Sequence, residues 1–339
     1  MGNIYYKFEL FVISFKILII EKGDYMAKVI LFGEPMALLI ADTVGPLEDV
    51  EHFTRVMSGA EVNVAIGLTR LGHDVEYVTR LGDDPFGRYI AKSLNYNRVG
   101  TSFITYDSVY RTGIQLKNRV TDGSDPQAPY YRKGSAASHI TKEDIDKINL
   151  NGIDLIHITG IPPAISQSAR QATFRLAERA KENNIFLTFD PNLRPALWED
   201  KETMVEVLNE LSQYADLILP GEEEGEILSG TADNKEIAKF YHNLGVKIVI
   251  VKNGSEGAYY SDGNESGQVS GFKVDKVVDT VGAGDGFAVG VISGIIEGKN
   301  MIESVERGNA IGAIQVTNLS DNEGLPNQEQ LTSFLSCRK

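Results

Sequence analysis

Short apolar runs alternate with helical patterns along most of this chain. From Lys28 onward, several apolar runs have the length of buried strands, at residues 29–32, 154–158, 185–189, 216–219 and 248–251. Amphipathic stretches at 168–183 and 235–244 lie between such runs and predict crossover helices, the second of which ends at Gly245. This alternation is typical of βαβ units and predicts a three-layer α/β/α fold around a mainly parallel central sheet.

Two segments do not fit this scheme. Residues 42–57 and 112–132 are richer in Thr, Tyr, Val, Gly and Pro, alternate in polarity, and contain turn signals such as Asp122-Gly123. We expect them to form a small β-rich lid on a single domain that spans residues 26–339.

The first 25 residues contain an apolar run that could suggest a signal peptide. Lys16 interrupts the run, it is too short to span a bilayer, and no small-residue cleavage site follows it. We therefore interpret residues 1–25 as an extension of doubtful structural role ahead of Met26.

Charge and cysteine content narrow the possible partners. The formal net charge of −14 argues against binding to nucleic acid or to anionic membranes, which require basic patches. It leaves small phosphorylated ligands possible, because backbone N–H groups and a few arginines hold them. Cys337 is the only cysteine, so a disulfide framework is excluded, and we expect a cytoplasmic protein.

The candidate chemistry lies near the C-terminus, in Asp279-Thr-Val-Gly-Ala-Gly-Asp-Gly-Phe287. An apolar helical pattern follows, so the glycines are expected at a helix N-terminus, where free N–H groups and the helix dipole stabilise negative charge. Gly282, Ala283 and Gly284 would form this anion hole. Asp285, in the first turn, would supply the base that a phosphoryl-transfer site needs at the acceptor hydroxyl. A plain helix start and a dinucleotide-binding fingerprint are the alternatives, but the segment lacks the full G-x-G-x-x-G order and comes late in the chain.

These residues resemble the C-terminal signature of the ribokinase-like, or phosphofructokinase-B, carbohydrate kinases, Asp-Thr-x-Gly-Ala-Gly-Asp-x-Phe. The segment from Ser58 to Gly72 is similar to their N-terminal signature, with Ser58 in place of the usual first glycine. The resemblance covers the chain from Lys28 to its C-terminus. It implies a ribokinase-like fold, ATP and Mg²⁺ as cofactors, and Asp285 as the base that deprotonates a primary alcohol.

The resemblance also implies a nucleotide site. The residues that it assigns to the nucleotide are Glu224, Lys252, Gly254, Gly257, Gly282, Gly284 and Asn309. The family's Asn-x-x-Glu element matches here only at Glu224, because Gly221 stands at the asparagine position, so any contact of Glu224 with the metal is expected to pass through water. A monovalent cation such as K⁺ and a homo-oligomer formed through the lid are further candidates that the family suggests.

On the sugar side, the resemblance assigns Gly33, Met36, Gly59 and Asn63 to the substrate. Members that phosphorylate 2-dehydro-3-deoxygluconate carry a similar Tyr-x-Arg, which maps to Tyr130 and Arg132, and a second arginine, which maps to Arg194. Two arginines suit a sugar carboxylate, so the expected reaction is ATP-dependent phosphorylation of 2-dehydro-3-deoxygluconate, with fructokinase or another ketose kinase as the alternative.

Several alternatives stay open at this stage. Both arginines could instead form structural ion pairs, and fructokinases carry a segment much like residues 190–198. A non-catalytic sugar- or nucleotide-binding regulator and an NAD-dependent oxidoreductase are alternatives from other functional classes.

Overall fold

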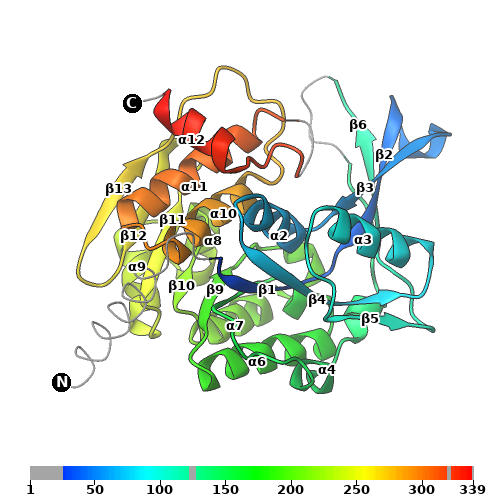
Figure 1. Ribbon diagram of the computed structural model, residues 1–339, viewed down its shortest axis with the longest axis horizontal. Coiled ribbons are helices and arrows are strands. Elements are labelled where there is room, and N and C mark those ends of the chain that lie inside the picture. Colours follow the sequence, from blue (N-terminus) through cyan, green and yellow to red (C-terminus); the bar gives the residue numbers. More distant parts are fainter. Residues whose placement is uncertain (1–25, 122–126, 319–321, 338–339) are drawn as a thin grey trace.

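The computed structural model describes residues 26–121, 127–318 and 322–337, so residues 1–25 and the Asp122-Gly123 turn lie outside the described residues. A large sheet runs through the centre of the molecule (Figure 1). Its strands, in spatial order, are β13 (Ser266–Ser270), β12 (Gly257–Ser261), β11 (Ile248–Lys252), β10 (Leu217–Ile218), β9 (Phe186–Asp190), β8 (Leu155–Thr159), β1 (Lys28–Phe32), β4 (Asp74–Gly82) and β5 (Ile104–Asp107). The strands from β11 to β5 pair in parallel, whereas β12 and β13 add antiparallel pairs at one edge.

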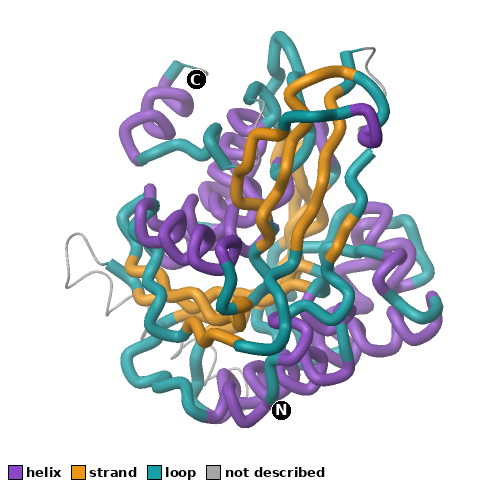
Figure 2. Tube along the Cα trace, turned by 90° about the vertical axis from the view of Figure 1, so that its right-hand side faces the viewer, coloured by secondary structure: helices purple, strands orange, loops and turns teal. Residues whose placement is uncertain are grey.

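Helices cover both faces of this sheet, as Figure 2 shows. One face carries α2 (Ala60–Arg70), α3 (Pro85–Tyr96), α10 (Ala283–Ile296), α11 (Met301–Gln315) and α12 (Gln328–Ser336). The other carries α4 (Lys142–Asp146), α5 (Pro162–Ile165), α6 (Gln167–Glu182), α7 (Lys201–Ser212), α8 (Glu222–Ser229) and α9 (Asn234–Asn243). Each helical layer buries its apolar stripe against one face of the sheet, so the core has two halves.

A second, smaller sheet projects from this body at the right of Figure 1. Its order is β3 (Phe53–Ser58), β2 (Met36–Val44), β6 (Ile114–Arg119) and β7 (Tyr130–Tyr131). We call these four strands the lid. They begin at Met36, earlier than the sequence pattern indicated. The predicted fold class, a ribokinase-like three-layer α/β/α fold with a small β lid, is confirmed.

Helix ends follow local chemistry. The Ser166 hydroxyl accepts from the Ala169 N–H at the start of α6, and the Asp233 carboxylate caps α9 in the same way. After α9 the chain turns at Gly245, whose φ of 101° favours glycine. The predicted helices at 168–183 and 235–244 therefore match α6 and α9 to within a residue at each end.

The helix that follows the signature motif is packed unusually close to its neighbour. A Cβ at Gly290 of α10 would lie 2.5 Å from the backbone of Arg307 on α11, and one at Gly294 would lie 2.7 Å from the Ser304 hydroxyl. Small residues thus allow α10 and α11 to touch backbone to backbone, and this contact fixes where the first turn of α10 lies.

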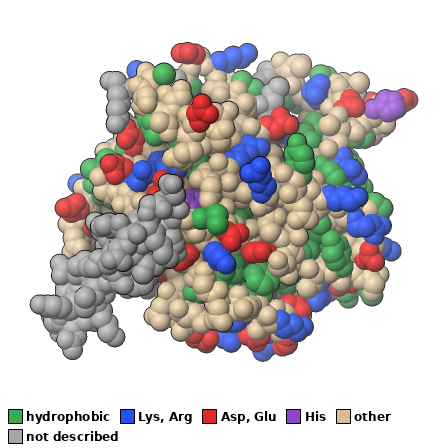
Figure 3. Space-filling view, in the orientation of Figure 1, with side chains coloured by type: hydrophobic (Ala, Val, Ile, Leu, Met, Phe, Trp, Pro, Cys, Tyr) green, Lys and Arg blue, Asp and Glu red, His purple; other side chains and the backbone are tan. Residues whose placement is uncertain are grey.

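Two features of the structure concern the prediction that nucleic acid and membranes are not partners: the surface charge and the lengths of the helices. On the face drawn in Figure 3, basic and acidic side chains are interspersed. Among the residues described, no helix combines the length and the apolar character needed to cross a membrane.

Candidate active site

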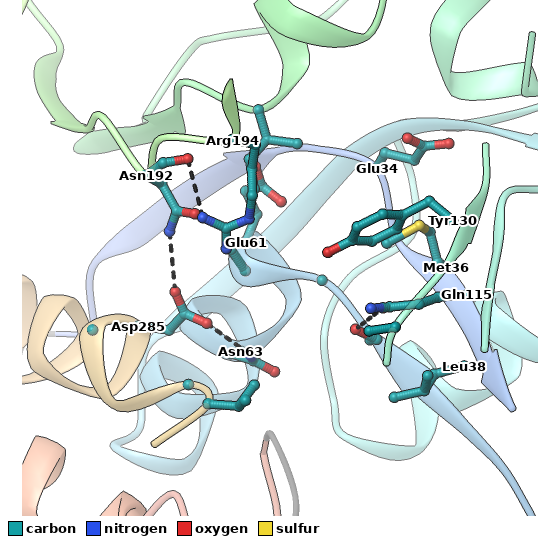
Figure 4. Close-up of a pocket in the computed structure, with 18 of the residues that line it drawn as sticks. Glu34, Met36, Leu38, Glu61, Asn63, Gln115, Tyr130, Asn192, Arg194 and Asp285 are labelled. Carbon is teal, nitrogen blue, oxygen red and sulfur yellow. Dashed lines mark hydrogen bonds between the residues drawn. The ribbon is translucent and has the colours of Figure 1, made fainter. Parts of the chain in front are cut away.

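A cavity of about 510 Å³ lies between the lid and the first turn of α10 (Figure 4). The lid contributes Met36, Leu38, Gln115, Lys117 and Tyr130 to its wall. Ser58 at the end of β3 also belongs to the lid. The start of α2, the segment after β9 and the signature motif supply many of the other residues. The remaining wall comprises Glu34, Gly59, Ala60, Glu61, Asn63, Ala128, Arg132, Ile161, Asn192, Arg194, Glu224, Lys252, Thr280, Val281, Gly282, Gly284 and Asp285. We call this space the sugar cavity.

Asp285 lies in the first turn of α10 and is nearly buried. Its Oδ2 accepts a hydrogen bond of 2.7 Å from Asn63 Nδ2, and its Oδ1 lies 3.5 Å from Asn192 Nδ2 (Figure 4). The Oδ1 atoms of both asparagines are buried without a hydrogen-bond partner. The side-chain amides of Asn63, in α2, and Asn192, just after β9, therefore orient the Asp285 carboxylate. Their own Oδ1 atoms are available to accept from hydroxyl groups.

The glycines before Asp285 open the helix as predicted. Gly282 is the N-cap of α10 and has a φ of 78°, a left-handed conformation that favours glycine. The Ala283 N–H, however, points to the Thr280 carbonyl at 3.3 Å. This amide is thus already used in a turn, in contrast to the expectation that the Ala283 N–H would be free.

A second cavity, of about 310 Å³, lies on the other side of the motif, and we call it the nucleotide cavity. Its wall comprises Lys252, Gly254, Ser255, Gly257, Gly271, Phe272, Val274, Val277, Thr280, Ala283, Gly284, Phe287, Asn309, Gly312, Ala313 and Val316. Lys252, Thr280 and Gly284 line both cavities. The two spaces therefore meet at the start of α10.

The residues predicted for the nucleotide fall into two groups. Lys252, Gly254, Gly257, Gly284 and Asn309 line the nucleotide cavity. The Asn309 side-chain amide donates to the Val269 and Ser270 carbonyls at 3.1 Å each, so its N–H groups are engaged with the last two residues of β13. Glu224 and Gly282 line the sugar cavity instead.

Glu224 is held by backbone amides. Its Oε1 accepts from the Leu193 N–H and its Oε2 from the Gly221 N–H, both at 2.7 Å. Gly221 therefore takes part through its backbone, although it replaces the asparagine that the family signature carries. Within the described parts of the chain, no group of three or more His, Cys, Asp or Glu side chains is arranged to hold a metal ion.

Lys252 ends β11 and carries its charge to the junction of the two cavities. Its Nζ lies 2.9 and 2.8 Å from the two carboxylate oxygens of Asp190 and 3.9 Å from Glu224. Burial alone would lower the pKa of Lys252, but the charges of Asp190 and Glu224 raise it above its ordinary value. Lys252 is therefore a cation at neutral pH.

Arg132 is buried in an ion pair. Its Nε donates to Glu34 at 2.7 Å, and the same Glu34 carboxylate accepts from the Ser135 hydroxyl at 2.5 Å. The sequence reasoning left open whether Arg132 binds a substrate or forms a structural pair. The structure gives it a carboxylate partner within the wall of the sugar cavity, so its charge is already compensated.

Arg194 differs from Arg132. It is exposed, and its Nη1 donates to the Leu193 carbonyl at 2.8 Å and more weakly to the Asn192 carbonyl at 3.4 Å. Its guanidinium contacts no carboxylate among the described residues. Of the other predicted sugar contacts, Met36, Gly59 and Tyr130 line the cavity.

Gly33 does not line the cavity in the described structure. A Cβ at this position would lie 2.4 Å from the Glu61 carboxyl group. Gly33 thus makes room for Glu61, a role different from the predicted contact with sugar.

Several cavity residues were not singled out from the sequence. Glu61 is buried, accepts from the Thr159 hydroxyl, and has a pKa that burial raises to about 7. Lys117 of the lid lies 3.1 Å from Asp279 of the signature motif. Asn192 lies in the segment 190–198, in which the family resemblance indicates Arg194 only, and its place next to Asp285 has no local sequence signal.

Comparison with known proteins agrees with this geometry. The pfkB family carbohydrate kinases match residues 26–328. The chain is 43% identical over 311 residues to 2-dehydro-3-deoxygluconokinase of Bacillus subtilis (strain 168), covering 91% of this chain and 96% of that one. A crystal structure of a PfkB protein from Polaromonas sp. JS666 superposes with a TM-score of 0.84 at 44% identity, covering 91% of this chain and 99% of that one.

A fructokinase from Vibrio cholerae O395, crystallised with fructose, ADP and calcium ion, has a TM-score of 0.80 at 29% identity, covering 91% of this chain and 99% of that one. The signature motif, the two adjoining cavities and these matches lead to one conclusion: the chain belongs to the pfkB family of carbohydrate kinases.

Proposed function

We propose that this protein transfers the γ-phosphoryl group of ATP to the terminal hydroxyl of 2-dehydro-3-deoxy-D-gluconate, giving the 6-phospho compound and ADP. The observation that carries the proposal is the position of Asp285, a nearly buried carboxylate at a helix N-terminus where a polar cavity meets a largely apolar one. The identity of 43% to the Bacillus subtilis 2-dehydro-3-deoxygluconokinase favours this sugar acid.

In this proposal Asp285 accepts the proton of the sugar hydroxyl as its oxygen attacks the γ-phosphorus, and ADP leaves on the opposite side. Asn63 holds the carboxylate toward the sugar cavity. The amides at the start of α10 and the ammonium of Lys252 stabilise the charge on the migrating phosphoryl group.

The acid group of the sugar needs a cation whose charge is not already compensated. Arg132, Lys117 and Lys252 each contact a carboxylate of the protein. Arg194 contacts only backbone carbonyls in the described structure, so we assign the sugar carboxylate to Arg194. Arg132 and Tyr130, whose ring centroid lies 5.5 Å from the Arg132 guanidinium carbon, would complete the wall beside it.

The donor set fits a Mg²⁺ ion that is carried by ATP phosphates and water. Both Glu224 oxygens already accept backbone N–H groups, so a water-mediated contact suits Glu224 better than direct ligation. The ion would neutralise phosphate charge when bound. Activation by K⁺ and a homo-oligomer formed through the lid stay predictions.

The test is an ADP-release assay with 2-dehydro-3-deoxygluconate, fructose, ribose and gluconate, using the Asp285→Ala variant as the control. We expect kcat/KM for the keto-acid to exceed that for fructose by at least about tenfold, because an ionic contact to Arg194 contributes about 1.5 kcal/mol or more. The likeness to the Vibrio cholerae fructokinase makes fructose the second candidate. Faster turnover of fructose would overturn the choice of sugar, and full activity of Asp285→Ala would overturn the mechanism.

A further inference from the structure

Asp190 contacts Lys252 but lines neither cavity. It is the last residue of β9 and is 2% exposed, at the start of the segment that carries Asn192 and Arg194 into the sugar cavity. Its Oδ1 accepts from the Asn192 N–H at 3.1 Å, and both of its oxygens accept from Lys252 Nζ. A buried carboxylate at this position therefore connects the sugar-side segment with the lysine.

The pair comes from two strands that flank a third. β10 (Leu217–Ile218) lies between β9 and β11. Asp190 ends β9 and Lys252 ends β11, so both side chains start at the same edge of the sheet. Lys252 is tied there by its N–H, which donates to the Pro220 carbonyl at 2.8 Å.

Lys252 Nζ also lies beside the anion hole. A Cβ placed on Gly284 would be 3.8 Å from this nitrogen. The ammonium is thus next to the first turn of α10, at the point where the two cavities meet and where a phosphoryl group would pass from one to the other. A lysine side chain has four rotatable bonds, so its position at this point depends on what holds its end.

We infer that Asp190 is a positioning residue, which holds the Lys252 ammonium at the junction of the sugar and nucleotide cavities so that it stabilises the phosphoryl group in transit. The inference rests on the proposed phosphoryl transfer. Two hydrogen bonds to one carboxylate fix the ammonium in both distance and direction, and the hydrogen bond that the Asn192 N–H donates to Asp190 Oδ1 places Asn192 beside Asp285 at the same time. Asp190 thereby aligns the Lys252 ammonium with the proposed base, Asp285.

A purely structural ion pair is the competing explanation, and the chain contains a matched pair with which to test it. Asp216 lies 2.6 Å from Lys247, and its second oxygen accepts from the Leu187 N–H at 2.9 Å. This pair joins the same three strands at their opposite ends, far from both cavities. Asp216→Asn is therefore the control for Asp190→Asn.

The experiment measures kcat and both KM values for wild type, Asp190→Asn, Lys252→Met, the double variant and Asp216→Asn. We expect Asp190→Asn to lower kcat by about 100-fold, with each KM changed by less than about threefold. Lys252→Met should lower kcat by at least as much, and the double variant should match Lys252→Met to within about threefold, because Asp190 acts through the lysine. Asp216→Asn should stay within about twofold of wild type.

A pH profile separates positioning from loss of folded protein. Lys252 faces Asp190, Glu224, Asp285 and His157; burial lowers the pKa of His157 to about 3, so it is neutral. Removing the Asp190 charge lowers the pKa of Lys252, so the alkaline limb of kcat should move to lower pH in Asp190→Asn. A loss of folded protein would instead lower the apparent kcat by the same factor at every pH, without moving the alkaline limb.

Three results would overturn the inference: kcat of Asp190→Asn within about threefold of wild type, losses that multiply in the double variant, or an unchanged alkaline limb. These variants are assayed with whichever of the four sugars of the ADP-release assay the wild type phosphorylates fastest. A preference for another sugar would therefore refute the proposed substrate but not the proposed role of Asp190. If none of the sugars is phosphorylated, the proposed function fails. The same variants are then compared by their rates of ATP hydrolysis without sugar. Equal rates for wild type and Asp190→Asn would refute the role of Asp190.

Discussion

The two cavities that meet at α10 are built from different kinds of residue. In the nucleotide cavity Lys252 is the only charged residue among the described residues of the wall, and glycines, valines and other small side chains make up most of the rest. The wall of the sugar cavity contains several charged residues, including Glu34, Glu61, Arg194 and Asp285. One cavity would hold its ligand by shape and backbone contacts, and the other would select its ligand by charge.

Charges in the sugar cavity are also paired across distant parts of the chain. Glu34 pairs with Arg132, Lys117 with Asp279, and Asp190 with Lys252. A buried pair is costly when one partner is removed, so substitutions here should have larger and more specific effects than those in the apolar cavity. If variants of the sugar cavity change the KM for ATP as much as the KM for the sugar, this division between the cavities is wrong.

The largest effect is expected at Asp285. Asp285→Asn keeps the shape of the side chain but removes the base, so kcat should fall by about 1000-fold while the KM for ATP changes little. The measurement is ADP release at saturating sugar, with the thermal unfolding midpoint as a check on folding. Loss of less than about tenfold would mean that another group accepts the proton.

Arg194 should set the preference for an acid. Arg194→Ala is expected to raise the KM for 2-dehydro-3-deoxygluconate by about tenfold to thirtyfold and to leave the KM for a neutral ketose nearly unchanged, because only the acid loses an ionic contact. Arg170→Ala is a suitable control, since Arg170 is a partly buried arginine that contacts the Pro163 carbonyl and the Trp198 ring and lies outside the wall of the sugar cavity. Equal effects on acid and neutral sugars would rule out the assignment of the carboxylate to Arg194.

The fold was largely predictable because its signals are local. The apolar run at 248–251 became β11 at Ile248–Lys252, and the amphipathic stretch at 168–183 became α6. β4, at Asp74–Gly82, was not identified, because Glu76 and Arg80 interrupt its apolar pattern at positions that are only partly buried. Its place in the sheet comes from pairing with β1 and β5, which a local pattern does not contain.

The same distinction applies to the site. Gly282, Gly284 and Asp285 lie within four consecutive residues, so a motif predicted their position at a helix N-terminus. Glu34 and Arg132 are 98 residues apart, and Asn63 and Asp285 are 222 residues apart. Such partners meet only through the tertiary fold, so the sequence did not distinguish a compensated arginine from a free one, nor did it find Glu34 or Asn192.

Lys117 links the lid to the signature motif and should have an intermediate effect. Its pair with Asp279 is about four-fifths buried, with side chains 15% and 22% exposed. Lys117→Met removes the charge and keeps the apolar stem, so we expect the KM for sugar to rise by about fivefold with little change in kcat. The same KM should rise more steeply with salt in the wild type than in the variant, since the variant lacks the Lys117–Asp279 ion pair that salt screens. A KM that is unchanged at low salt would mean that the pair does not hold the lid over the cavity.

Glu61 should give the smallest effect, visible as a pH dependence. Burial raises its pKa from 4.5 to about 7, so the carboxyl group becomes negative as the pH rises through neutrality. A new negative charge in the wall should repel an anionic sugar, and its KM should rise by about threefold between pH 6 and 8, whereas the KM of a neutral sugar should not. Because the folded state favours the protonated group, its contribution to stability is present below pH 4.5 and is lost as the pH rises through 7. Glu61→Gln should remove both trends, and a pH dependence of KM that persists in this variant would assign the titration to another group.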